Sequence, residues 1–211
     1  MSTAALVIEG FVAAGTIAVA VVAIWGDWIR SVVAPPKLVI RPHTTRGDPT
    51  KLTAMGIVIP GGGIPIIYYH LKVVNVRPWL TVHNCRVLLK GVTRRGPDGR
   101  FHPVPMAVPI PYVWAPAEAM PQQVTIAKEQ VMDFGCIAKD ADHFRPLLQT
   151  YPNNFQGYVK KGEALRYYLE IDGTNFTSSS PHVFEVAWDG EWFFEPEKME
   201  QHLRITEINE P

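Results

Sequence analysis

The most continuous hydrophobic segment of the chain covers residues 4–25, where Glu9 is the only formal charge before Asp27. No polar position recurs at helical spacing between Gly10 and Ile24, whereas a core helix keeps a solvent-facing side. At about 1.5 Å per residue, a helix over this segment is about 33 Å long, and the hydrocarbon core of a bilayer is about 30 Å thick. The pattern therefore predicts an N-terminal transmembrane α-helix and argues against a buried core helix.

After Pro35 and Pro36 the hydrophobic pattern becomes short and mostly alternating, as is typical of β-strands between turns. On the segment 80–90, Cys85, Val87 and Leu89 share one face with His83, and this face is predicted to point inward. The expected strands cover residues 37–41, 68–76, 80–90, 124–126, 131–138, 164–172 and 183–189. Many short strands separated by turn residues favour an antiparallel β-sandwich.

Two segments have helical character within this mainly β pattern. Residues 142–150 are compatible with one helical turn, and 195–205 predict a short C-terminal helix with Met199 and Leu203 facing inward. The expected organisation is therefore a transmembrane helix with its interfacial exit over residues 1–34 and a β-sandwich domain over 35–211.

The distribution of charge predicts the membrane topology and argues against nucleic acid as a partner. The formal net charge is zero and the basic residues are scattered, which argues against nucleic acid. Basic residues follow the helix closely and none precedes it, which predicts an N-terminus outside and a cytoplasmic domain in the cell inner membrane. The alternative is a periplasmic domain. On the cytoplasmic topology Cys85 and Cys136 are free thiols.

The predicted helix has two sets of residues suited to membrane contacts. Gly10, Ala14 and Ala18 recur every four residues, which lets a neighbouring helix approach closely. The alternative is that small residues are simply common in membrane helices. Trp25 and Trp28 suit the inner interface, with Arg30 in the headgroup region, so the lipid bilayer is an expected partner.

Prolines recur between residues 103 and 121, which excludes a central strand there. The segment is expected either to form a proline-broken edge strand around 110–114 or to serve as an arm that binds a partner. The residues of that possible partner surface are Pro109, Pro111, Tyr112 and Trp114.

Catalytic and metal-binding patterns are weak. The histidines never occur at two-ligand spacing such as H-x-H, and Gly61–Gly63 lack the sequence of a phosphate-binding loop. The cluster Lys139, Asp140, Asp142 and His143 could be an acid–base pair, but a solvated loop with a helix cap is favoured. The sequence therefore predicts no catalytic residue, no metal and no cofactor.

Aromatic residues come in adjacent pairs, and on a strand one member of each pair faces inward and the other outward. The outward members are candidates for a contact surface. These residues are Tyr68, Tyr69, Tyr167, Tyr168, Trp188, Trp192, Phe193 and Phe194.

Two segments carry a family resemblance, YYHLKVVNVRPWLTVHNCRVLL at 68–89 and ALRYYLEIDGTNFTSSSPHVFEVAWDGEW at 164–192. With the WGDW motif after the hydrophobic segment, they resemble a group of uncharacterised prokaryotic single-pass membrane proteins. The resemblance implies an N-terminal transmembrane helix followed by an immunoglobulin-like β-sandwich, and it implies no activity. The segments 60–65 and 103–121 depart from the group.

These observations predict a membrane-anchored accessory or interaction subunit that is not an enzyme. Its helix would pack into a larger integral-membrane protein complex while the sandwich braces the surface of that complex. Two alternatives remain open. One is a freestanding ligand-binding or sensor module with its site at the proline-rich segment, and the other is an enzyme with a dispersed site around Asp140, His143 and Cys136.

Overall fold

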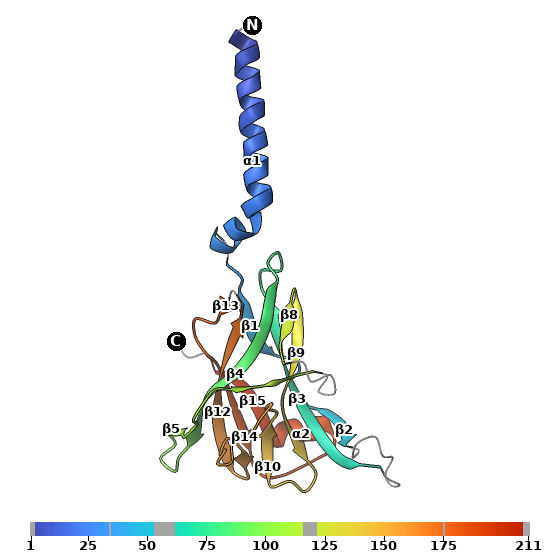
Figure 1. The fold of residues 1–211 in the computed structure, drawn as a ribbon. Helices are drawn as coiled ribbons and strands as arrows, with labels where there is room; N and C mark the ends of the chain where they lie inside the picture. The colour runs from blue at the N-terminus through green and yellow to red at the C-terminus, as the bar shows by residue number, and fades with distance from the viewer. Residues whose placement is uncertain (1–2, 34, 53–61, 116–121, 175, 209–211) are drawn as a thin grey trace.

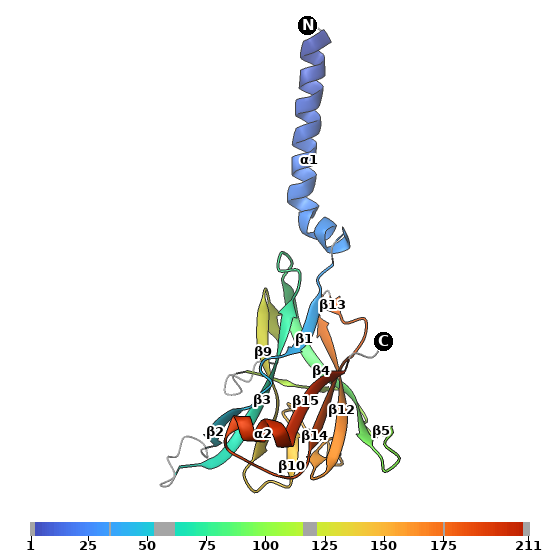
Figure 2. The ribbon, with the colours of Figure 1, turned by 180° about the vertical axis from the view of Figure 1, so that it is seen from behind.

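The computed structural model describes residues 3–33, 35–52, 62–115, 122–174 and 176–208. Within them the chain is mainly β, with two antiparallel sheets, one long N-terminal helix and one short helix near the C-terminus. The long helix, α1 (Thr3–Val33), projects away from both sheets (Figure 1 and Figure 2). The N-terminal part of the glycine segment, the end of the proline-rich segment at 116–121 and Asn175 lie outside the described residues.

The first sheet is built around the long strands β3 (Ile64–Asn75) and β9 (Glu129–Ala138), which pair antiparallel. Its strand order is β1-β3-β9-β10-β11, with β2 also pairing with β3 and β7 with β9. The other strands are β1 (Leu38–Pro42), β2 (Asp48–Leu52), β7 (Val113–Trp114), β10 (His143–Pro146) and β11 (Val159–Lys160).

The second sheet is built around β4 (Val82–Arg95) and β12 (Glu163–Gly173). Its strand order is β15-β14-β12-β4-β5, with β13 pairing with β12 and both β6 and β8 with β4. The other strands are β5 (Phe101–Val104), β6 (Ile110–Pro111), β8 (Val124–Ile126), β13 (Phe176–Thr177), β14 (His182–Trp188) and β15 (Leu203–Ile208).

The two sheets are joined by a segment that passes from one to the other. β6 pairs with β4 of the second sheet, and two residues later β7 pairs with β9 of the first. Between them the Tyr112 backbone N–H donates to the Val87 carbonyl over 2.9 Å. Strands that change sheets in this way form the corners of a sandwich. The prolines here limit each strand to two residues, as predicted for proline-broken edge structure.

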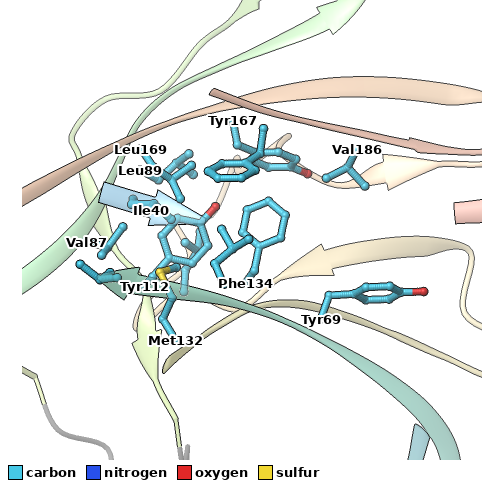
Figure 3. Close-up of a cluster of buried hydrophobic side chains, with 14 of the residues drawn as sticks. Ile40, Tyr69, Val87, Leu89, Tyr112, Met132, Phe134, Tyr167, Leu169 and Val186 are labelled. Carbon is cyan, nitrogen blue, oxygen red and sulfur yellow. The ribbon is translucent and has the colours of Figure 1, made fainter. Parts of the chain in front are cut away.

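Aromatic and aliphatic side chains from both sheets fill the space between them (Figure 3). Phe134 of β9 lies at the centre of this core and is fully buried. Its ring centroid lies 5.6 to 6.1 Å from those of Tyr112, Phe144, Tyr167 and Phe184. Two of these partners, Tyr167 and Phe184, belong to the second sheet. A single side chain of the first sheet therefore contacts the middle of the second.

The predicted inward face of the segment 80–90 is confirmed from Cys85 onward but not before it. Cys85, Val87 and Leu89 are buried as expected, but His83 is exposed. Asn84 adopts φ 54°, and the pairing of β4 with β8 shifts register between Val82 and Cys85. This irregularity reverses the alternation, so His83 and Cys85 do not share a face.

Two predictions near the C-terminal half need correction. Residues 142–150 do not form a helical turn, because β10 pairs with β9 and so continues the sheet. The predicted helix over 195–205 is shorter, α2 (Pro196–His202), and the chain continues directly as β15. Met199 and Leu203 are each 1% exposed, so their predicted inward positions are confirmed.

The predicted transmembrane helix also needs correction. Among the residues that the structure describes, no helix combines the length and the apolar character needed to cross a membrane.

Phe134→Ala is expected to lower the free energy of unfolding by about 3–5 kcal/mol, because it removes a ring that contacts both sheets and leaves a cavity. Urea unfolding followed by tryptophan fluorescence measures this change. Phe194→Ala is the control, since Phe194 is 39% exposed, and it should cost less than about 1 kcal/mol. Equal losses in the two variants would contradict the central role of Phe134.

Candidate interaction surface

The side chains of α1 are directed into open space. Every described side chain of this helix is exposed except those at 21 and 26, which are half-buried. The exposed set includes large apolar residues with 52% to 76% of their surface accessible, namely Phe11, Val12, Ile17, Val19, Val22, Ile24, Trp25 and Trp28. An apolar surface of this extent makes α1 a candidate interaction surface.

The residues predicted for helix packing and for the membrane interface all lie on α1. Ala14 and Ala18 are exposed, as are Trp25 and Trp28, while the exposure of Gly10 and Arg30 is outside the described set. In Figure 1 the last turns of α1 bend away from the axis of the preceding turns. Trp25 and Trp28 lie within nine residues of the C-terminal end of α1 at Val33.

A second row of small residues runs more nearly parallel to the axis of α1. Ala13, Thr16, Ala20 and Ala23 are separated alternately by three and four residues, which places them on one side of a helix. All four are exposed, and the Thr16 hydroxyl donates to the Val12 carbonyl over 2.8 Å, so it presents no free donor. We call these four residues the small-residue face. The sequence contained this spacing, but only the row Gly10, Ala14 and Ala18 was predicted from it.

The sandwich presents a turn toward α1. The turn between β3 and β4 lies at the end of the sandwich nearest α1 (Figure 1 and Figure 2) and exposes Val76 and Trp79 by 45% and 58%. Buried Asn75 holds this turn by donating to the Leu80 carbonyl over 2.6 Å and accepting from the Arg77 N–H over 3.0 Å. Arg77 in turn donates to the Pro35 carbonyl over 2.7 Å. These contacts fix the turn beside the segment that leaves α1.

The proline-rich segment offers less surface than the sequence indicated. Tyr112 and Trp114 are 2% and 1% exposed and belong to the core. Pro109 is exposed and Pro111 is half-buried. The side chains of Tyr112 and Trp114 are therefore not available to a partner, because the sheet-changing path of the chain turns both inward.

The outward members of the aromatic pairs are only partly exposed. Tyr69 and Tyr167 are buried, as expected for one member of each pair, while Tyr68 and Tyr168 are half-buried. Trp188, which has no aromatic neighbour in the sequence, is also buried. Trp192 and Phe193 pack partly against the core, and Phe194 is exposed.

The side chains that could take part in catalysis or metal binding are dispersed or make structural contacts. His143 bonds to Asp142 over 2.5 Å and its ring lies 4.5 Å from that of Tyr158. Cys136 instead contacts Arg145 on the paired strand. Among the described residues, no group of three or more His, Cys, Asp or Glu side chains is arranged to hold a metal ion.

Both cysteines are free and buried. Burial raises the pKa of the Cys85 thiol to about 11. Burial also raises the pKa of Cys136, and the nearby Arg145 offsets only part of this effect. A thiol of raised pKa is protonated at neutral pH and is a weak nucleophile.

A polar contact around His70 was not predicted from the sequence. Its Nδ1 lies 2.8 Å from Asp133 Oδ1, an ion-pair distance without hydrogen-bond alignment, and its Nε2 lies 3.3 Å from Asp48 Oδ2. Asp133 is 4% exposed, at a point where the pairing of β3 and β9 shifts register. The sequence signal for this contact was the carboxylate of Asp133 within the otherwise apolar segment 131–138. The contact ties β2, β3 and β9 together.

The outward face of the second sheet is charged but balanced. Basic side chains of this face pair with carboxylates on other strands of the same sheet. The Phe101 ring lies 4.0 Å from the Arg166 guanidinium carbon. The pairs are Arg86 with Asp172 at 2.7 Å, Lys90 with Glu170 at 3.3 Å, Arg95 with Glu185 at 2.6 Å and Arg166 with Glu185 at 3.0 Å. Such a face does not attract ions of one sign.

Comparison with known proteins does not assign the chain to a family. No model of a known protein family matches it, and no curated protein matches it significantly. The resemblance to single-pass prokaryotic membrane proteins therefore stays a prediction. The structure by itself defines a class: a two-sheet antiparallel β protein with an N-terminal helix whose apolar side chains are exposed.

The native protein is expected to react with a thiol reagent at pH 8 at least about 100-fold more slowly than a small free thiol, because both thiols are buried and protonated. Absorbance after addition of an aromatic disulfide reagent measures the rate. The protein unfolded in urea should release two equivalents of the aromatic thiolate, at the rate of a small free thiol. Rapid modification of one cysteine in the native state would show an activated thiol and favour an enzymatic site.

Proposed function

We propose that this protein is a non-catalytic accessory subunit of an integral-membrane protein complex. In this proposal α1 packs among helices of the complex and the sandwich braces its surface. The observation that carries the proposal is the exposed apolar surface of α1, which the two sheets do not cover. Burying a large apolar side chain contributes about 1.5–3 kcal/mol, so α1 gains strongly from an apolar partner.

The small-residue face gives this packing a geometry. Small side chains at alternating three- and four-residue spacing allow helices in membranes to approach closely. On the helix surface Val12 and Val19 flank this face on one side, and Ile17 and Ile24 flank it on the other, all of them exposed. A partner helix can therefore lie along the small residues and contact both flanks. The proposal does not require α1 to cross a bilayer alone, because neighbouring helices would surround it.

We further propose an immunoglobulin-like arrangement of the sandwich and a cytoplasmic location at the inner membrane. Two antiparallel sheets and a segment that changes sheets are compatible with the first. Lys37, Arg77 and Lys128 near the α1 end of the sandwich support the second, since basic residues close to a membrane segment favour the cytoplasmic side.

Purification of the full chain from its native membrane in mild detergent tests the accessory role. The expected result is a stoichiometric complex with an integral-membrane protein, detected by mass determination and peptide identification. Recovery as a monomer or homodimer would overturn the proposal.

The double variant Ala13→Leu and Ala20→Leu is expected to reduce partner recovery at least tenfold, because two larger side chains prevent close approach of a helix. Quantitative mass spectrometry of the purified complex measures the ratio of partner to protein. Ala14→Leu with Ala18→Leu is the matched control, since it adds the same groups to the neighbouring row. Loss of the partner only in the control would assign packing to Gly10, Ala14 and Ala18 instead.

A further inference from the structure

A pocket opens at the α1 end of the sandwich between the start of β1 and the segment that links β13 to β14. It has a cavity volume of about 530 Å³. Its polar lining consists mainly of Lys37, Arg77, Ser178, Ser179, Ser180 and His182. These residues come from three separate parts of the chain, and the fold alone brings them together.

The charge of this pocket is unbalanced. None of its described lining residues is Asp or Glu. Neither Lys37 nor Arg77 forms an ion pair with a carboxylate in the described part of the chain, in contrast to the paired cations on the outward face of the second sheet. Two cations that line a pocket with no acidic residue among its described lining favour the binding of an anion.

The hydrogen-bonding groups of the pocket also suit an anion. The Ser178 hydroxyl accepts the Ile171 N–H over 3.0 Å, which holds the serine segment against β12. Ser179 and Ser180 are exposed at the rim, where hydroxyl groups can donate to oxygen atoms. Burial lowers the pKa of His182, so at pH 7 it is a neutral donor or acceptor and not a third cation.

The position of the pocket indicates the source of the anion. Pro35 and Pro36, which follow α1 directly, form part of its wall, and Arg77 donates to the Pro35 carbonyl. Exposed Trp79 lies on the same turn as Arg77, and exposed Trp25 and Trp28 lie near the end of α1. Tryptophan is enriched where an apolar layer meets polar headgroups.

We propose that this pocket binds the phosphate group of an anionic phospholipid headgroup. Arg77 and Lys37 neutralise the phosphate, and the serine hydroxyls donate to its oxygen atoms. The proposal rests on the proposed function only in that α1 holds this end of the sandwich at a membrane surface. It adds a specific ligand contact that α1 does not supply.

Titration of the full chain in neutral detergent with short-chain phosphatidylglycerol tests the proposal by calorimetry. The expected result is saturable binding that the double variant Lys37→Ala and Arg77→Ala weakens at least tenfold. Lys139→Ala, which removes an exposed charge at the turn between β9 and β10, is the control and should bind as the native chain does. Arg77→Lys with Lys37 intact keeps the positive charge but changes the bond to Pro35. Because charge neutralises the phosphate, this variant should retain most of the binding.

Three other outcomes would overturn the proposal. Absence of saturable binding, or equal binding by the native chain and the double variant, would show that the pocket does not take this headgroup. Binding of inorganic phosphate as tightly as the lipid would assign the pocket to free phosphate. Purification without a partner protein would refute the accessory role alone, since saturable lipid binding by the same sample would still support the pocket.

Discussion

The contact between the inner faces of the two sheets is the interaction on which the rest of the structure depends. Phe134 is fully buried in the first sheet and its ring meets Tyr167 and Phe184 of the second. Because each sheet has one apolar face, neither can leave water without the other. The outward faces are then free to carry ion pairs, such as Arg95 with Glu185, which contribute little to stability but keep the surface polar.

The sheet-changing segment shows how this packing decides what the surface can offer. A proline-rich sequence reads as an exposed arm, yet β6 and β7 each pair with a different sheet, and Tyr112 and Trp114 enter the core between them. The candidate interaction surfaces therefore lie at the α1 end of the sandwich. There the turn held by Asn75, the exit from α1 and the serine segment meet around one pocket.

The helix α1 imposes a different constraint, because its apolar surface is not covered by its own chain. A folded domain buries most of its large apolar side chains, and exposed apolar surface of this extent is typical of an interface. The proposed partner helices would cover the small-residue face, while Lys37 and Arg77 would face headgroups. Packing and electrostatics would then orient the sandwich together.

Features that depend on local pattern could be predicted from the order of residues alone. The N-terminal helix and the alternation along β4, β12 and β14 follow from side-chain periodicity. Features that depend on strand pairing are visible only in the folded chain. The irregularity at Asn84 moved His83 outward, pairing with β9 made residues 143–146 a strand, and Asp133 became buried beside His70. The pocket belongs to the second group, since Lys37, Arg77 and Ser178 are far apart in sequence and only strand pairing makes them neighbours.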